Sequence, residues 1–325
     1  MRYSGTIKYI SRWTLVLACI VLLGAVTLMA AKKDKKAGKA PEKTEATQTD
    51  PSQYVGSDTC KGCHEEQSKN IEASPHFRTE AKKIRGEAAH GCESCHGPGA
   101  EHVASGGDKT KIFNFKGASA EAASKRCLSC HESNQEQQQF IRSTHLENQV
   151  GCLSCHSAHH STQEYLLTKR QPRLCFDCHS DIKGDFQKPF RHRVEEELIS
   201  CSDCHNAHGT TIGRQLRATA DQNFVCFKCH SDKRGPYFYE HMPVKVEGCT
   251  ACHTPHGSTN PRLLNTARTN SLCLQCHTNM GGRNAAGNVN PGTGSVHQQN
   301  KFNQNCTICH MAIHGSNSSS LLFQP

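Results

Sequence analysis

Twenty of the 21 cysteines in this chain follow one repeated pattern, C-x-x-C-H, which occurs ten times. This pattern is the attachment signature of c-type haem. Two thiols three positions apart lie on one side of a helical turn, where they can add to the two vinyl groups of one haem. The sequence therefore predicts ten covalently bound c-type haems. The cysteines that would hold them are Cys60, Cys63, Cys92, Cys95, Cys127, Cys130, Cys152, Cys155, Cys175, Cys178, Cys201, Cys204, Cys226, Cys229, Cys249, Cys252, Cys273, Cys276, Cys306 and Cys309.

The histidine that ends each motif is the predicted proximal ligand of a haem iron. These residues are His64, His96, His131, His156, His179, His205, His230, His253, His277 and His310. A structural zinc site would join two C-x-x-C pairs into one centre of four ligands, and it would not require a histidine after every pair. Disulfide bonds would also leave the ten histidines unexplained, so covalent haem is the favoured interpretation.

Twelve histidines remain outside the motifs, and ten of them flank the even-numbered motifs, one before and one after each. The odd-numbered motifs have no such companions, so each pair of motifs brings two spare histidines for two irons. We expect these ten to be the distal ligands, which would give every iron two histidines. They are His76, His102, His145, His159, His192, His208, His241, His256, His297 and His314.

A spare histidine three residues after a motif histidine cannot reach the opposite face of the same haem. We therefore expect His159, His208 and His256 to serve a haem other than the one beside them. His90 and His160 are left over and are expected to be ordinary exposed or neighbouring residues. Three methionines are alternative ligands that would raise a haem potential, namely Met242, Met280 and Met311.

The elements that must position these ligands are predicted to be short. Successive odd-numbered motifs lie about 50 residues apart after a longer first interval, which indicates five two-haem repeat units. Few segments show sustained helical or strand periodicity. Apolar residues make up only 35% of the chain, below the usual share of a globular domain, so the haems must supply most of the core. The predicted fold class is a multihaem cytochrome c, elongated, with short helices and long loops around a chain of ten haems and almost no β-sheet.

The N-terminal segment predicts export from the cytoplasm. Residues 1–31 combine early positive charges with an uncharged, mostly apolar run from Trp13 to Ala31. Its length lies between that of a signal peptide and that of a spanning helix, so both a cleaved signal and a retained anchor stay open. Cys19, the one cysteine outside the motifs, is interpreted as a small residue in this run rather than a lipoprotein site.

Composition predicts the remaining domain organisation. Residues 32–58 are rich in Lys, Ala, Glu, Thr and Pro and are expected to form a flexible tether. Residues 59–325 form the predicted decahaem domain, with two pentahaem halves at about 59–190 and 191–325. The formal net charge is +9, but residues 1–55 contribute +5 of it, and no basic stripe is interleaved with aromatic residues. Nucleic-acid binding is therefore not expected.

Several stretches of the motif region resemble one family, the periplasmic decahaem cytochromes of outer-membrane electron conduits, of the MtrA/DmsE/PioA type. The resemblance covers about residues 56–325. It is carried by the order of the spare histidines and by CHGPGAEH at 95–102, CSDCHNAHG at 201–209, SDKRGPYFYEH at 231–241 and CTACHTPHGS at 249–258. It implies an elongated haem wire inserted into an outer-membrane β-barrel porin of a Gram-negative bacterium.

The resemblance also implies a function and partners. The chain is expected to carry electrons between periplasmic carriers and an extracellular multihaem cytochrome or reductase, as in extracellular respiration or metal reduction. Membrane association would come through the barrel or an N-terminal anchor. The main alternative is a free periplasmic shuttle or an extracellular haem filament subunit, and a multihaem reductase is a further one. No motif departs from C-x-x-C-H, which favours an electron-transfer protein over an enzyme.

Overall fold

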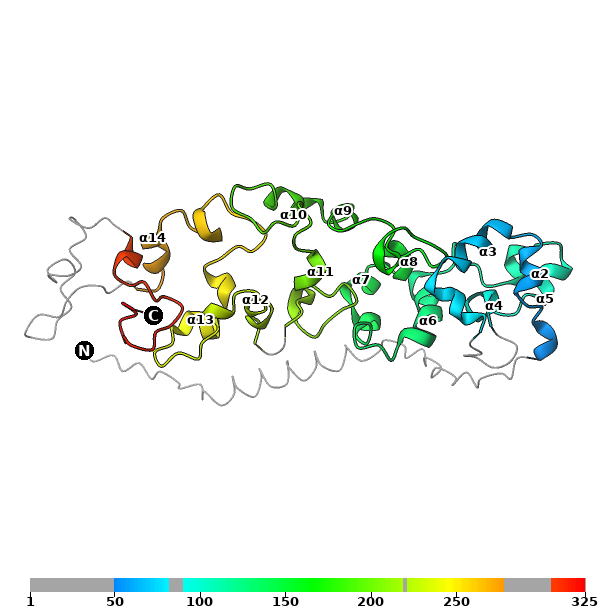
Figure 1. The fold of residues 1–325 in the computed structure, drawn as a ribbon, viewed down its shortest axis with the longest axis horizontal. Coiled ribbons are helices and arrows are strands. Elements are labelled where there is room, and N and C mark those ends of the chain that lie inside the picture. Colours follow the sequence, from blue (N-terminus) through cyan, green and yellow to red (C-terminus); the bar gives the residue numbers. More distant parts are fainter. Residues whose placement is uncertain (1–49, 82–89, 219–220, 278–304, 325) are drawn as a thin grey trace, which may run out of the picture. The chain divides into compact units, whose positions relative to one another are not determined.

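The computed structural model describes residues 50–81, 90–218, 221–277 and 305–324 (Figure 1). The predicted signal or anchor and most of the predicted tether lie outside these residues, as does His297, the expected last distal ligand. Asp50–Pro325 forms one compact unit. Within the described ranges, no helix combines the length and the apolar character needed to cross a membrane.

Short helices are the only regular elements of the described chain, and the longest, α6, has 12 residues. The α-helices are α2 (Ser57–Lys61), α3 (Glu65–Glu72), α4 (Cys92–His96), α5 (Ala100–Ala104), α6 (Ala120–His131), α7 (Thr144–Glu147), α8 (Cys152–Cys155), α9 (Arg173–Phe176), α10 (Ser180–Asp185), α11 (Cys201–Cys204), α12 (Phe224–Phe227), α13 (Met242–Val246) and α14 (Thr269–Cys273). The 3₁₀ turns are η1 (Pro51–Gln53), η2 (Pro75–Thr79), η3 (Lys109–Lys111), η4 (Phe140–Arg142), η5 (Glu164–Leu166), η6 (Gly213–Gln215), η7 (Ser231–Lys233), η8 (Cys249–Ala251), η9 (Pro261–Leu263) and η10 (Cys306–Ile308). The first cysteine of every motif lies in one of these helices or turns, as haem attachment through a helical turn requires.

Strand pairing in the described residues is limited to isolated bridges. Three of them join the histidine of an even-numbered motif to a leucine eleven residues later: His156 with Leu167, His205 with Leu216 and His253 with Leu264. The other two join Phe190 with Ser258 and Tyr239 with Ser316. The expectation of short helices, long loops and almost no β-sheet is thus confirmed for the described part of the chain.

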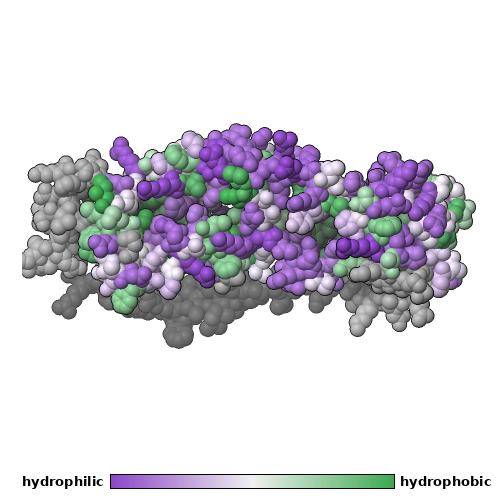
Figure 2. All heavy atoms as spheres, viewed as in Figure 1, coloured by the Kyte–Doolittle hydropathy of each residue, from purple (hydrophilic) through white to green (hydrophobic). Residues whose placement is uncertain are grey.

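The side-chain core is small. The buried hydrophobic residues of the described chain are Ala123, Leu128, Phe140, Leu146, Phe186, Val194, Val225 and Ala312. Leu128, Phe140 and Leu146 pack together, and no larger cluster of buried apolar side chains exists in the described ranges. Hydrophobic residues on the visible face are interspersed among hydrophilic ones (Figure 2). These side chains alone are too few to hold a chain of this length together.

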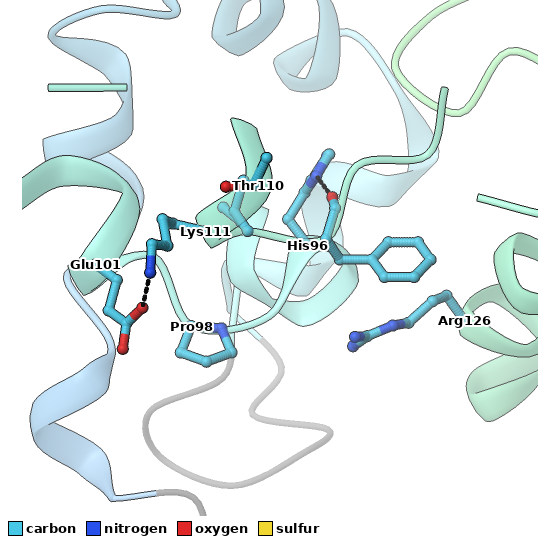
Figure 3. A pocket seen from close by; sticks show the side chains of 8 residues that line it. His96, Pro98, Glu101, Thr110, Lys111 and Arg126 are labelled. Carbon is cyan, nitrogen blue, oxygen red and sulfur yellow. Dashed lines mark hydrogen bonds and ion pairs between the residues drawn. The ribbon is translucent and has the colours of Figure 1, made fainter. Parts of the chain in front are cut away.

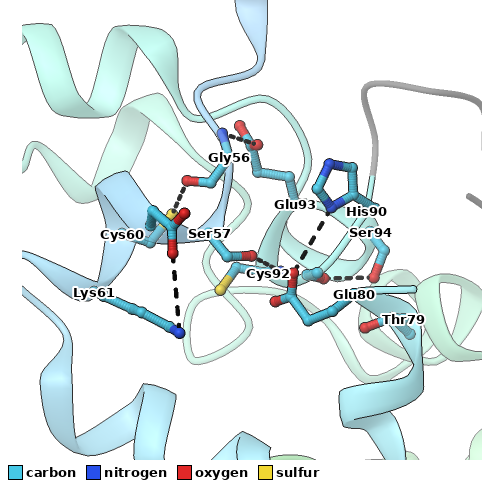
Figure 4. A network of polar contacts seen from close by, with 12 residues as sticks. Gly56, Ser57, Cys60, Lys61, Thr79, Glu80, His90, Cys92, Glu93 and Ser94 are labelled. Atoms are coloured by element: carbon cyan, nitrogen blue, oxygen red, sulfur yellow. Dashed lines mark hydrogen bonds and ion pairs between the residues drawn. The ribbon is translucent and has the colours of Figure 1, made fainter. Parts of the chain in front are cut away.

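The described part of the chain begins before the first motif. Residues 50–58, which composition assigned to the tether, contain η1 and the start of α2. The Glu93 side chain holds this segment, because its carboxylate accepts hydrogen bonds from the backbone N–H groups of Val55 (3.1 Å), Gly56 (2.9 Å) and Gly99 (2.8 Å). Figure 4 shows the bond to Gly56. Glu93 is only 2% exposed, and the three hydrogen bonds offset the free-energy cost of burying its carboxylate.

Glu93→Ala is expected to lower the free energy of unfolding by about 2–4 kcal/mol, because buried N–H groups lose their acceptor. Denaturant titration of the haem-loaded protein measures this change. Glu121→Ala is the matched control, since Glu121 forms an exposed pair with Lys125 and should leave the midpoint unchanged. Equal midpoints for the two variants would contradict a clamping role for Glu93.

Candidate haem-binding sites

Nine motif histidines face a spare histidine at nearly one fixed distance. The centroids of the two imidazole rings lie 6.0–6.3 Å apart in every case. The pairs, motif histidine first, are His64–His102, His96–His159, His131–His76, His156–His208, His179–His145, His205–His256, His230–His192, His253–His314 and His277–His241. The tenth motif histidine is His310, and the one expected distal ligand that is not among these pairs, His297, lies outside the described residues.

This spacing fits one metal ion held between two imidazoles. A metal–imidazole bond is about 2.0–2.1 Å long and a ring nitrogen lies about 1.2 Å from its centroid, so two opposed ligands place their centroids about 6.3–6.5 Å apart. Rings in direct contact would lie closer together. The residues present therefore fit an iron with two histidine ligands at each of the nine pairs.

The pairing follows one rule along most of the chain. A spare histidine that precedes an even-numbered motif faces the histidine of the next odd-numbered motif, as His145 faces His179. A spare histidine that follows one even-numbered motif faces the histidine of the even-numbered motif before that one. His208, for example, follows the motif ending at His205 and faces His156. His102 is the exception, because it follows the first even-numbered motif and faces His64 instead. The other eight pairs cross from one repeat unit into the next.

Backbone carbonyls hold the rings of the even-numbered motif histidines. The Nδ1 atom of His156 lies 2.8 Å from the carbonyl oxygen of Tyr165, and the same contact recurs at His205 and Arg214 (2.9 Å). A carbonyl can only accept, so Nδ1 carries the proton and Nε2 is left free to bind metal. The remaining contacts of this kind are His96 with Phe113, His253 with Arg262 and His310 with Leu321.

The acceptor residues of three of these contacts share a left-handed backbone. Tyr165, Arg214 and Arg262 have φ values of 55°, 59° and 59°. This conformation is uncommon for residues other than glycine. It turns the carbonyl back toward the motif histidine in all three units, and the isolated bridge to the following leucine closes the same loop.

A second set of hydrogen bonds joins the ring of one spare histidine to the backbone carbonyl just before another. The Nδ1 atom of His145 donates to the carbonyl oxygen of Ala207 (2.8 Å), the residue immediately before His208. His76 bonds in the same way to Ala158, and His192 bonds to Pro255. The orientation of one spare histidine is therefore coupled to the backbone that carries the next one.

Burial keeps several of these histidines neutral. It lowers the pKa of His314 to about 4, with a further contribution from the nearby charge of Lys233. Burial also lowers the pKa of His96, His159 and His208. A neutral imidazole is the form that binds a metal.

Stability is expected to fall as the pH drops from about 6.5 to about 4, the window between the unfolded and folded pKa values of His314. In that window the unfolded chain binds more protons than the folded chain, so the free energy of unfolding decreases with pH. Denaturant midpoints at pH 7 and pH 4.5, each measured in 1 M salt to screen surface ion pairs, test this expectation. Equal midpoints would contradict it.

The first cysteines of the two motifs in each predicted unit lie together. The side chain of Cys60 lies next to that of Cys92, and the same proximity relates Cys127 to Cys152. The other three contacts are Cys175 with Cys201, Cys226 with Cys249 and Cys273 with Cys306. Each odd-numbered motif thus contacts the even-numbered motif that follows it. The contact lies at the first of the two cysteines that would tether each haem.

An open-sided cavity of about 470 Å³ lies beside His96 (Figure 3). Its rim carries Lys111 and Arg126, and the Arg126 guanidinium lies 4.4 Å from the centroid of the Phe113 ring. Its lining is mostly polar, with Ile112 and Phe113 as apolar members, and its cationic groups would suit the propionates of a porphyrin. The donor set and the cavity therefore fit haem at this motif.

The two leftover histidines lie apart from the ring pairs described above. His90 is near Glu80, with 3.7 Å between Nδ1 and Oε2 (Figure 4). His160 is exposed, whereas the ring of its neighbour His159 faces His96. Across the described ranges, no group of three or more Cys, His, Asp or Glu side chains forms a site for a separate metal ion.

Comparisons with known proteins match the motif region. Residues 145–184, 192–235 and 241–282 match the family described as doubled CXXCH motif, and residues 100–157 match the family of cytochrome c554 and c-prime. Each match to the doubled motif begins at a spare histidine and also contains the motif histidine that this residue faces.

One curated relative and one solved structure extend the comparison. The multiheme cytochrome MtrA of Shewanella baltica (strain OS185) is 34% identical over 313 residues, which cover 93% of this chain and 92% of the relative. The undecaheme cytochrome from the S-layer of Carboxydothermus ferrireducens is 21% identical over 73% of this chain, with a TM-score of 0.15. The matched part spans one third (33%) of that cytochrome.

The repeated C-x-x-C-H motifs, the opposed histidine rings and the near full-length match to MtrA agree with one another. Haem attached through these cysteines supplies the redox chemistry, and the chain supplies the tethers and ligands. The chain belongs to the MtrA family of multihaem c-type cytochromes, which are electron-transfer proteins rather than enzymes.

Proposed function

We propose that this chain binds ten haems, each iron between two histidines, and conducts electrons through an outer-membrane β-barrel. The electrons would pass between periplasmic carriers and an extracellular acceptor or donor. The distal ligands would be the nine spare histidines found opposite motif histidines, together with His297 for His310. Export through the segment at residues 1–31 would place the domain in the periplasm of a Gram-negative bacterium.

The observation that carries this proposal is the series of opposed histidine rings, which the described residues show for nine of the ten motif histidines. It runs from His64 with His102 at one end of the described motifs to His253 with His314 and His277 with His241. Two histidines on each iron leave no coordination position for a substrate. Such a series supports electron transfer from one haem to the next rather than chemistry at any one of them.

Contacts between neighbouring motifs support a continuous path. Within a unit the first cysteines touch, as Cys127 touches Cys152. Between units the spare histidines are linked through a backbone carbonyl, as His145 is linked to the residue before His208. Both kinds of contact alternate along the chain, so no motif stands isolated from its neighbours.

The haem content and ligation are tested on the purified protein. Mass spectrometry is expected to show ten haems, and the oxidised spectrum is expected to be entirely low-spin. A high-spin iron signal, or fewer than ten haems, would contradict the proposed ligation and favour a haem with an open coordination position.

The conduit role is tested by extracting the outer-membrane fraction with mild detergent and capturing the tagged chain. A partner of the size of a β-barrel is expected to co-purify, and the soluble periplasmic fraction of the same cells is the control. Recovery of the chain alone from the soluble fraction would contradict the conduit and favour a free electron shuttle.

A further inference from the structure

The helices of three even-numbered motifs begin without a capping side chain of their own. Gly91 precedes α4, Gly151 precedes α8 and Gly248 precedes η8, and a glycine has no side chain to offer. The first N–H groups of a helix have no partner within the helix and need an acceptor from elsewhere. In each case, that acceptor comes from the neighbouring odd-numbered motif.

In four of the five units, the acceptor is the residue three positions before the first cysteine of the odd-numbered motif. The first cysteine of the following even-numbered motif donates its backbone N–H to that side chain. The hydrogen bonds are Cys92 to Ser57 Oγ (3.2 Å), Cys152 to Ser124 Oγ (3.3 Å), Cys249 to Asn223 Oδ1 (2.8 Å) and Cys306 to Asn270 Oδ1 (3.2 Å). Four of the five units share this cap between motifs.

Three of the four capping residues are buried, and Asn270 is half-buried. Ser124 is 0% exposed and Asn223 is 4% exposed. A Cβ atom added at Gly248 would lie 3.0 Å from Asn223 Oδ1, and one added at Gly91 would lie 2.1 Å from Ser57 Oγ. The glycine before the even-numbered motif therefore gives the cap the room that it needs.

The third unit shows what replaces the cap when it is absent. Pro172 occupies the capping position and has no polar side chain. The next motif is instead preceded by Ser200, whose backbone N–H donates to Asp203 Oδ2 (2.7 Å) in a capping box. Gln171 bonds to Ser202, one residue beyond the first cysteine, through both its amide oxygen and its amide nitrogen (3.1 Å each).

Each shared cap lies beside the contact between the first cysteines of the two motifs in a unit. The cysteine that donates to the cap is also the one whose sulfur meets the first cysteine of the odd-numbered motif, as Cys249 meets Cys226. Both sulfurs would be bonded to haem, so the cap fixes the backbone that sets their separation.

We propose that Ser57, Ser124, Asn223 and Asn270 are positioning residues that set the contact between the two haems of a unit. The inference rests on the proposed ten-haem function and adds which side chains control the coupling within a pair. None of them binds iron or haem in this scheme, because each acts through the backbone of the neighbouring motif.

Asn223→Ala tests this role in the fourth unit. We expect all ten haems to remain attached and low-spin, while the electron paramagnetic resonance signal of two of the ten haems changes as their magnetic coupling weakens. Asn223→Ser should restore the parent signal, because the first two units use serine at this position. Asn223→Ser, like Asn223→Ala, lacks the hydrogen bond from Asn223 Nδ2 to the Val244 carbonyl oxygen (2.7 Å). A parent-like signal in Asn223→Ser would therefore show that the change in Asn223→Ala comes from loss of the cap.

Asn265→Ala is the matched control. Its side chain also bonds to the backbone near the same motif, from Nδ2 to the Ala251 carbonyl oxygen (2.8 Å), but it does not bridge two motifs. We expect the control to keep the parent resonance signal. An unchanged signal in Asn223→Ala, or the same change in Asn265→Ala, would overturn the proposal.

Ser124→Ala repeats the test in the second unit if Asn223→Ala fails to fold, because it removes a single oxygen atom. It is expected to change the signal of two haems, and an unchanged signal overturns the proposal. The number of low-spin haems in the parent protein distinguishes failure of the proposed function from failure of the capping role. Fewer than ten low-spin haems in the parent would contradict the proposed function, whereas ten such haems with unaltered coupling in the variants would contradict only the role of the cap.

Discussion

Produced without covalent haem attachment, the chain is expected to be unfolded, with no cooperative transition on heating. Backbone ordering costs about 1–2 kcal/mol per residue, and the few buried apolar side chains of the described chain cannot offset it. Under the predicted export through residues 1–31, a chain that lacks them would stay in the cytoplasm, where c-type haem is not attached to bacterial proteins. Circular dichroism of that product, compared with the exported protein, measures the difference.

A graded version of this experiment removes one haem. Replacing Cys152 and Cys155 together with alanine is expected to destabilise the protein more than Leu128→Ala does. Leu128 belongs to the largest buried apolar cluster of the described chain, and loss of such a side chain costs about 2–5 kcal/mol. A double cysteine variant as stable as Leu128→Ala, or a folded chain without haem, would show that side chains rather than haems form the core.

Replacing His208 with methionine is expected to raise the potential of one haem by on the order of 0.1 V, since axial ligands tune potentials over about 0.8 V. The ring centroid of His208 lies 6.1 Å from that of His156, so under the proposed ligation the affected haem would be the one attached at residues 152–156. All ten haems should stay attached, because the cysteines are unchanged. Redox titration followed by absorbance measures the shift.

His160→Met is the control for this substitution. His160 is exposed and belongs to neither predicted set of ligands. It should leave the titration unchanged. Loss of haem from His208→Met, or no spectral change, would contradict the assignment of His208 as a distal ligand.

The sequence was sufficient to predict the features that depend on local chemistry. Haem attachment needs two thiols and a histidine within five residues, so each motif could be recognised without knowledge of the fold. The two sets of histidines were separable because their distances to the even-numbered motifs repeat. The scarcity of apolar residues predicted a small side-chain core, which the structure confirms for the described residues.

The partners of the spare histidines could not be predicted, because they depend on contacts between units. His102 faces His64 rather than an earlier even-numbered motif, since the first odd-numbered motif has no histidine upstream to face it. Glu93 was also missed, because it occupies a variable position of a motif and its three partners are backbone groups. Those same bonds order residues 50–58, which composition alone placed in the tether.

The capping residues recur at one position in the sequence, but their role could be recognised only from the hydrogen bonds of the structure. Ser57, Ser124, Asn223 and Asn270 stand at the same offset from four motifs. Serine and asparagine are common in loops, so their repetition carried little weight. Pro172 breaks the series in the third unit, and its replacement by a local capping box could be understood only from the hydrogen bonds.

The crossed pairing of histidine rings also sets an order of events for a chain that leaves the cytoplasm with its N-terminus first. His145 would already have crossed the membrane when the motif ending at His179 emerges. The motif ending at His156 would wait for His208, which emerges only after two further motifs have passed. Under the proposed ligation, a chain arrested partway through translocation would carry an exposed coordination position that the finished protein lacks.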